Sequence, residues 1–106
     1  MPYPSARRLI DRGLHVALAT DFNPGTCYCE NMQMIIGLAI SAMGMSLEEA
    51  LAAATIHGAR ALGLQDEIGS LEVGKRCELA FWSLADYREI GYHFGVNQVR
   101  TTLVQR

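Results

Sequence analysis

Several features that mark common protein classes are missing from this sequence of 106 residues. Its nine Lys and Arg residues are dispersed, so it has no basic stripe of the kind that binds nucleic acid. Its longest apolar stretch, Met34–Met45, contains Gly37 and Gly44 and is shorter than the roughly 20 residues that a membrane-spanning helix needs. No apolar signal core follows the early arginines. We therefore expect no nucleic-acid partner, no membrane contact and a cytoplasmic location.

Cysteines are few, and their spacing is not that of a structural zinc site. The three cysteines, Cys27, Cys29 and Cys77, are odd in number and include no C-x-x-C pair. Cys27 and Cys29 could form a metal-binding or redox pair. Because disulfides rarely persist in the cytosol, the sequence favours reduced thiols.

Hydrophobic residues make up 50% of the chain and charged residues only 19%, which is typical of a packed globular segment. A length of 106 residues is enough for one small domain and too short for two. The apolar fraction is high for a surface that faces water on all sides. We therefore expect some apolar faces to pack against a partner.

The N-terminal half has the pattern of an α/β protein. Ser5 begins a short predicted helix, and Gly13 ends it. The continuous apolar run Val16–Thr20 follows, and such a run is typical of a strand that is buried on both faces in a parallel sheet. Two amphipathic helices are predicted next, over Met32–Met43 and Leu47–Leu62.

The local signals become clearer after residue 45. Ser46 and Glu49 match the S-x-x-E capping box, in which each side chain binds the other residue's backbone N–H. Strands are predicted over Glu78–Trp82 and Val99–Val104. The chain therefore divides near residues 65–68 into an α/β part and a β-rich tail.

Asp21 is the most informative polar residue, because it directly follows the predicted strand. Enzymes with parallel sheets build their sites at the carboxyl ends of the strands. A rigid strand would hold the Asp21 carboxylate at that edge, open to a ligand. The sequence Asp21–Gly25 is also typical of a turn, so from these residues alone a turn-forming or capping role is the alternative.

Three segments resemble those of known hydrolases. Leu18–Thr26 is similar to the last barrel strand and loop of imidazolonepropionases, and Tyr92–Asn97 is similar to a stretch near their C-terminus. Ile68–Lys75 resembles the segment with which chains of the wider amidohydrolase superfamily leave the barrel. The resemblance implies an α/β fold. Residues 1–66 would be the last βα units of a (β/α)8 amidohydrolase barrel, and residues 67–106 would be part of a small β-sandwich domain.

The resemblance also implies an activity and the residues that carry it. Imidazolonepropionases hydrolyse 4-imidazolone-5-propanoate to N-formimidoyl-L-glutamate in histidine degradation, and they use one zinc or iron ion. At the matching positions, Asp21 would be a catalytic residue and a metal ligand, and Asn23, Gly25 and Thr26 would bind the substrate. A glycine in such a loop makes physical sense, because it lets a backbone N–H approach a carboxylate closely.

The other catalytic groups of that family have no counterpart in this sequence. Its remaining metal ligands are upstream histidines, whereas His15, His57 and His93 match no ligand position and are predicted to be packing residues. One carboxylate does not hold a catalytic metal, which takes about three protein ligands. We therefore expect the C-terminal portion of a longer enzyme, with Met1 at a position inside the barrel. Alone, this portion is expected to bind no metal, to be inactive and to self-associate.

Two alternatives stay open at this point. The chain could belong to another cyclic-amide hydrolase or deaminase of the superfamily, such as a dihydroorotase-like or guanine-deaminase-like protein. The Asn23–Gly25 loop and the Tyr92–Asn97 stretch count against that alternative. The chain could instead be a free-standing binding or assembly module. A reading frame that continues upstream to a His-x-His pair favours the enzyme, whereas an upstream stop codon and promoter favour the module.

Overall fold

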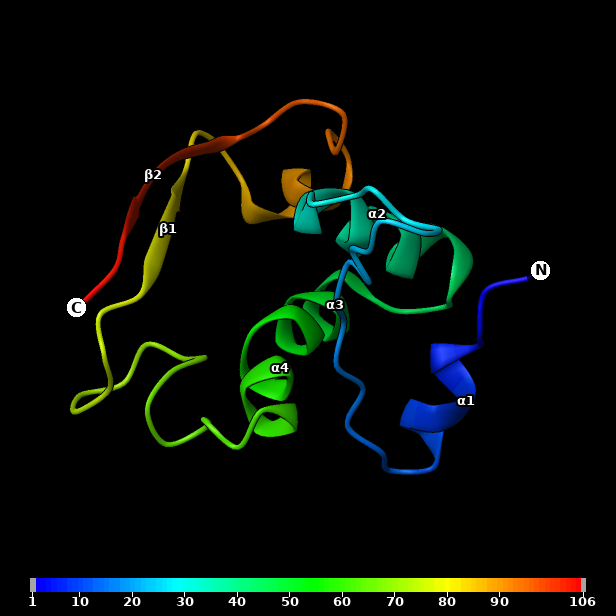
Figure 1. Ribbon diagram of the computed structural model, residues 1–106, viewed down its shortest axis with the longest axis horizontal. Helices are drawn as coiled ribbons and strands as arrows, with labels where there is room; N and C mark the ends of the chain where they lie inside the picture. Colours follow the sequence, from blue (N-terminus) through cyan, green and yellow to red (C-terminus); the bar gives the residue numbers. More distant parts are fainter. Residues whose placement is uncertain (1, 106) are drawn as a thin grey trace.

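Residues 2–105 are described by a computed structural model, in which the α-helices gather on one side and a pair of strands lies on the other (Figure 1). The elements are α1 (Ala6–Asp11), α2 (Met32–Ala42), α3 (Leu47–Ala54), α4 (Ile56–Ala61), β1 (Leu79–Trp82), the 3-10 helix η1 (Tyr87–Gly91) and β2 (Val99–Leu103). Across residues 2–105, every helix is too short or too polar to cross a membrane.

The first predicted helix is confirmed as α1, and a glycine ends it. Gly13 adopts φ 82, a left-handed conformation that glycine reaches easily because it lacks a Cβ atom. The Gly13 N–H donates to the carbonyl of Ile10 at 2.8 Å. Arg7 then ties α1 to α3, because its guanidinium donates two hydrogen bonds of 2.9 Å to the carboxylate of Glu49.

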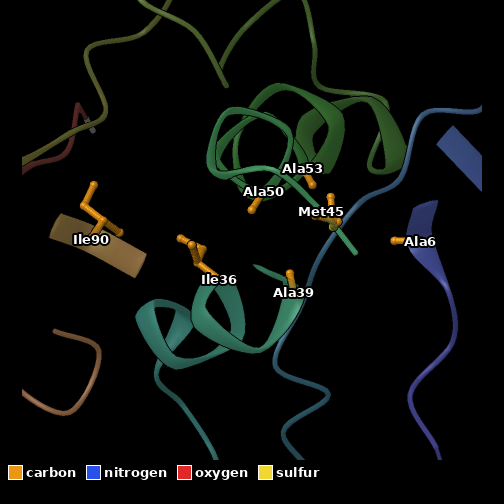
Figure 2. Close-up of a cluster of buried hydrophobic side chains, with 7 residues drawn as sticks. All are labelled: Ala6, Ile36, Ala39, Met45, Ala50, Ala53 and Ile90. Carbon is orange, nitrogen blue, oxygen red and sulfur yellow. The ribbon is translucent and has the colours of Figure 1, made fainter. Parts of the chain in front are cut away.

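Alanines allow α2 and α3 to pack closely (Figure 2). Ala39 of α2 and Ala50 and Ala53 of α3 are 0% exposed. The larger Ile36 of α2 and Ile90 of η1 complete the contact, and both are buried. Because side-chain size sets the distance between helix axes, small side chains in this contact bring the two helices close together.

The predicted capping box at the start of α3 is confirmed. Glu49 N–H donates to Ser46 Oγ at 3.2 Å, and Ser46 N–H donates to Glu49 Oε2 at 3.0 Å. The same carboxylate also receives the Arg7 guanidinium. The hydrogen bond from Arg7 and then that from the Ser46 backbone lower the pKa of Glu49 below its usual value. One side chain therefore joins the start of α3 to α1.

The prediction of a strand over Val16–Thr20 is wrong for this chain. The segment forms no regular element, and the Leu18 N–H donates instead to the carbonyl of Ala53 in α3 at 3.1 Å. A strand needs a neighbouring strand to bind its backbone groups, and residues 2–105 place none beside this segment. Ala17 and Ala19 are exposed, so the burial expected on both faces is incomplete.

The single helix predicted over Leu47–Leu62 is also wrong, because the chain breaks at Thr55 into α3 and α4. Thr55 adopts φ −122 and ψ −91, which is outside the helical region. Its hydroxyl donates to the carbonyl of Leu51 at 2.7 Å, and its N–H turns to the carbonyl of Ala52. The side chain thus takes the acceptor that the backbone N–H would use in a continuous helix.

Both predicted strands of the tail are confirmed, and they pair with each other. β1 and β2 are antiparallel, and Leu79 lies opposite Leu103. The glycine-rich segment before them folds around the ammonium group of Lys75, whose side chain is only 12% exposed. Lys75 Nζ donates to the carbonyl of Gln65 at 2.5 Å and to the hydroxyl of Ser70 at 2.7 Å. This enclosed cation holds the loop that leads from α4 to the sheet.

The tail also returns to the helices, which the sequence does not predict. Ile90 of η1 belongs to the core cluster and lies on the same side of it as Ile36 of α2 (Figure 2). Gln33 of α2 is 4% exposed, and its Nε2 donates to the carbonyls of His93 at 2.9 Å and Val96 at 3.0 Å. The stretch Tyr92–Asn97 is therefore held against α2 by a buried side-chain amide.

Because Ala50 is fully enclosed, we expect Ala50→Leu to force α2 and α3 apart. Overpacking of this kind costs about 1–3 kcal/mol. The free energy of unfolding, measured by urea titration with circular dichroism, should fall by that amount. Ala42→Leu at the exposed end of α2 is the matched control and should change it by less than about 0.5 kcal/mol. Equal losses in the two variants would contradict the alanine packing.

Candidate functional site

The loop after Val16–Thr20 contains the predicted site residues. Asp21 has φ 55 and is the one non-glycine residue in the described range 2–105 with a positive φ. A left-handed backbone brings Cβ close to the following carbonyl and costs roughly 1–2 kcal/mol, although Asp and Asn adopt it more readily than most residues. The Asp21 residue is exposed. The turn therefore presents a carboxylate to solvent from a strained backbone.

Asn23 organises this loop through its side chain. Its Oδ1 accepts hydrogen bonds from the N–H groups of Gly25 at 3.0 Å and Thr26 at 2.7 Å, and from the Thr26 hydroxyl at 3.1 Å. Its Nδ2 donates to the carbonyl of Asp21 at 2.8 Å. Its backbone N–H donates to the carbonyl of Cys27 at 2.7 Å. The structure thus brings the four predicted site residues into one hydrogen-bonded loop.

Three donors converge on one point of this exposed loop. They are the two backbone N–H groups and the hydroxyl that bind Asn23 Oδ1, and they come from Gly25 and Thr26. A Cβ atom on Gly25 would lie 3.3 Å from Asn23 Oδ1, so a larger residue would crowd the oxygen that accepts these bonds. Successive N–H groups that point to one oxygen are the arrangement that proteins use to bind anions. The donor set therefore suits a carboxylate oxygen.

Neighbouring side chains hold the two ends of the loop, a role that the sequence does not reveal. Cys27 Sγ donates to the carbonyl of Thr20 at 3.2 Å, and the Tyr28 hydroxyl donates to the carbonyl of Pro24 at 2.6 Å. Cys27 and Cys29 are both free thiols. Cys27 therefore closes the loop as a hydrogen-bond donor.

The loop alone does not fit a metal ion. Among the side chains of residues 2–105, no three of His, Cys, Asp or Glu gather where they could hold one. Asp21 supplies a single carboxylate, whereas catalytic metal sites typically have about three protein ligands. A metal at this loop would need ligands from beyond this chain.

Two histidines that are distant in sequence lie together before the Val16–Thr20 segment. His15 Nδ1 is 3.1 Å from Nδ1 of His57 on α4, and Arg60 Nη1 is 3.2 Å from His15 Nδ1. Burial, then His15 and then Arg60 lower the pKa of His57. The sequence predicts the histidines to be separate packing residues and does not reveal this cluster. The only local signal is the spacing of His57 and Arg60, which places both on one face of a helix.

Comparison with known proteins identifies the family. The model of the amidohydrolase family matches residues 3–104. This chain belongs to the amidohydrolase family. Among the relatives of this amidohydrolase chain is the imidazolonepropionase of Caldanaerobacter subterraneus subsp. tengcongensis, 47% identical over 102 residues, or 96% of this chain and 25% of that protein. The imidazolonepropionase of Parabacteroides distasonis is 46% identical over 102 residues, or 96% and 24%.

The predicted resemblance to imidazolonepropionases is confirmed by these matches. A further relative of that name, from Porphyromonas gingivalis, is 45% identical over 101 residues. The amidohydrolase chain spans about a quarter of the length of the curated relatives that it matches.

If Asn23 organises the loop, Asn23→Ala should free the backbone of Gly25 and Thr26. Amide hydrogen exchange at these two positions, measured by NMR, should become about fivefold faster, because each loses a hydrogen bond worth about 1 kcal/mol. Tyr28→Phe removes only the hydroxyl contact with Pro24 and serves as the control. Unchanged exchange in Asn23→Ala would show that the loop is held by other contacts.

Proposed function

We propose that this chain forms the C-terminal part of a metal-dependent cyclic amidohydrolase that converts 4-imidazolone-5-propanoate and water to N-formimidoyl-L-glutamate. The observation that carries the proposal is the left-handed backbone of Asp21 in an exposed loop that hydrogen bonds hold. A strained backbone conformation of this kind persists only where surrounding contacts stabilise it, and such conformations are frequent at functional sites. The identity to imidazolonepropionases supports the choice of substrate.

In this proposal, residues 1–66 are the last βα units of a (β/α)8 barrel, and residues 67–106 are part of a small β-sandwich domain. Neighbouring barrel strands would bind the backbone groups of Val16–Thr20, which have no strand beside them here. They would also cover the exposed Ala17 and Ala19. Asp21 would then follow the carboxyl end of a barrel strand, where barrel enzymes have their active sites.

The proposed roles follow from the contacts of the loop. Asp21 is a catalytic residue and one ligand of a zinc or iron ion, whose other ligands come from the upstream part of the longer protein. Asn23 keeps Asp21 in position by donating to its carbonyl. Asn23, Gly25 and Thr26 would bind the substrate. Gly25 and Thr26 carry the donors for its carboxylate, in place of the Asn23 oxygen that they bind now.

The second candidate is another cyclic-amide hydrolase or deaminase of the superfamily, and the third is a free-standing assembly module. The family match fits either enzyme equally well, whereas the relatives named above favour the first. Exposed apolar side chains such as Leu62, which is 74% exposed, are the observation that favours assembly.

In the longer enzyme, Asp21→Asn replaces a charged metal ligand with a weak neutral one and should lower kcat/KM more than about a hundredfold. Loss of a residue that only supports a metal ligand costs at most about that much. Thr26→Ala removes a single hydroxyl worth about 1 kcal/mol and should lower kcat/KM about fivefold. Release of N-formimidoyl-L-glutamate is the measurement.

Three further samples complete this experiment. The 106-residue chain alone, with zinc or iron added, should match a blank that contains only the metal. Dihydroorotate and guanine, offered to the longer enzyme, should turn over more slowly than the imidazolone. Equal and mild effects of the two substitutions would refute the ligand assignment, and faster turnover of either alternative compound would favour the second candidate.

We also propose that the isolated chain self-associates. A surface hollow beside Val16–Thr20 is lined largely by apolar side chains of that segment and of α3 and α4. They include Ala17, Leu18, Ala19, Ala54, Ala59 and Leu62. Covering apolar surface contributes about 25 cal/mol per Å². Apart from the Leu18 N–H, which binds Ala53, and the Thr20 carbonyl, which binds Cys27, the backbone groups of the segment are open to pairing with a second chain, as at the edge of a sheet.

Light scattering behind size exclusion, at micromolar concentration, should therefore give a mass above that of the monomer that rises with concentration. Leu62→Ser places a hydroxyl in the hollow and should shift the mass toward the monomer. Val73→Ser changes an even more exposed apolar side chain, 108% against 74% for Leu62, which lies outside the hollow, and it should leave the mass as it was. A monomer mass at all concentrations would refute self-association.

A further inference from the structure

Three side chains that can carry positive charge converge at the start of the Val16–Thr20 segment. His15 Nδ1 lies 3.1 Å from Nδ1 and 3.4 Å from Nε2 of His57. Arg60 Nη1 lies 3.2 Å from His15 Nδ1 and 3.4 Å from His57 Nδ1. The two imidazole rings meet edge to face, with centroids 4.4 Å apart. Their nitrogens and one guanidinium nitrogen therefore share a single small region.

No acidic side chain compensates this cluster within residues 2–105, where none forms an ion pair with any of its three members. Glu48 and Glu49 of α3 line the same hollow as His15 and His57, but both are engaged elsewhere. Glu48 accepts a hydrogen bond from the Tyr87 hydroxyl at 3.0 Å, and Glu49 binds the Arg7 guanidinium. The cluster therefore has donors without an anionic partner.

We propose that His15, His57 and Arg60 bind a tetrahedral oxyanion, the phosphate group of inorganic phosphate or of a phosphate monoester. Arg60 supplies a permanent charge and a planar set of N–H donors suited to phosphate oxygens. Each imidazolium adds an N–H donor from a different direction. His15 and Arg60 are exposed, so their side chains can move apart to admit the anion.

A metal cation is the poorer occupant of this cluster. Arg60 keeps its charge at every accessible pH, and it lies within 3.4 Å of both Nδ1 atoms that would bind the ion. The two histidines would also be the only ligands, because no third His, Cys, Asp or Glu joins them in the described part of the chain. The positive charge of Arg60 repels a cation, and the same charge attracts an anion.

A bound oxyanion should change the protonation of His57 in a direction that the geometry sets. The charged or titratable groups that face the two histidines are Arg60 of α4 and Glu48 and Glu49 of α3, while α1 contributes only Ile10 to the hollow. Without an anion, burial and the two neighbouring positive groups lower the pKa of His57. A bound oxyanion reverses the electrostatic part of that effect. Occupation of the site should therefore raise the pKa of His57.

The cluster is separate from the loop proposed above as catalytic. His15 precedes the Val16–Thr20 segment and Asp21 follows it, and the segment runs as a long trace between α1 and the loop (Figure 1). The assignment of an anion site uses none of the roles proposed for Asp21, Asn23, Gly25 or Thr26. It would hold whether or not the longer protein hydrolyses an imidazolone.

The test is an NMR titration of the full chain, labelled at histidine Cε1, with inorganic phosphate at pH 6 and pH 8 and constant ionic strength. The signals of His15 and His57 should shift saturably at pH 6, and the apparent pKa of His57 should rise. The dissociation constant at pH 6 should be about tenfold larger in Arg60→Gln, which loses a charge-assisted hydrogen bond. His93→Asn, which changes the histidine outside the cluster, should bind as the native chain does.

Two further arms make the outcome decisive. Methyl phosphate in place of inorganic phosphate tells a monoester site from a free-phosphate site, and saturable binding of either supports the proposal. Sodium chloride at equal ionic strength should produce no saturable shift. Equal shifts with chloride, or phosphate binding unchanged in Arg60→Gln, would overturn the proposal. The chloride comparison needs only the native chain, so it stands even if a variant fails to fold.

Discussion

The close contact of α2 with α3 is the interaction on which the other packing of this chain depends. Ala39, Ala50 and Ala53 keep the two helices near each other, and the Met45 N–H closes the turn between them by donating to the carbonyl of Ala39 at 3.1 Å. Other elements then attach to this pair. Ile90 brings η1 to it, and the guanidinium on α1 reaches the cap of α3. A core with so few large side chains covers little surface, which accounts for the many apolar residues that stay exposed.

The same contact determines where the candidate site lies. The Ala53 carbonyl binds the Leu18 N–H, so α3 holds the irregular segment that leads to Asp21. The position of Asp21 at the end of that segment could be predicted, because an apolar run before an acidic residue is visible in the sequence. The role of Asn23 in the loop could not be predicted from the sequence. Its residue type fits both a substrate contact and a turn, and only the converging donors show that it organises the loop.

Local patterns predicted local structure, because the forces involved act within a few residues. The glycine that ends α1 and the capping box of α3 are of this kind. The strand over Val16–Thr20 failed as a prediction because a strand depends on neighbours that no local pattern contains. The break at Thr55 failed because a hydroxyl competed for one backbone carbonyl inside an otherwise helical stripe. The contact between His15 and His57 depends on the direction of α4 after that break. Local sequence patterns do not determine this direction, so they could not predict the contact.

The backbone of Asp21 implies a conflict between stability and activity at this position. Glycine adopts φ 55 without strain, so a chain selected only for resistance to unfolding would gain about 1 kcal/mol by replacing Asp21. That gain would cost the carboxylate on which the proposed chemistry depends. Engineering of a more heat-resistant variant should therefore leave this residue alone and seek its improvements elsewhere, such as on the exposed faces of the helices.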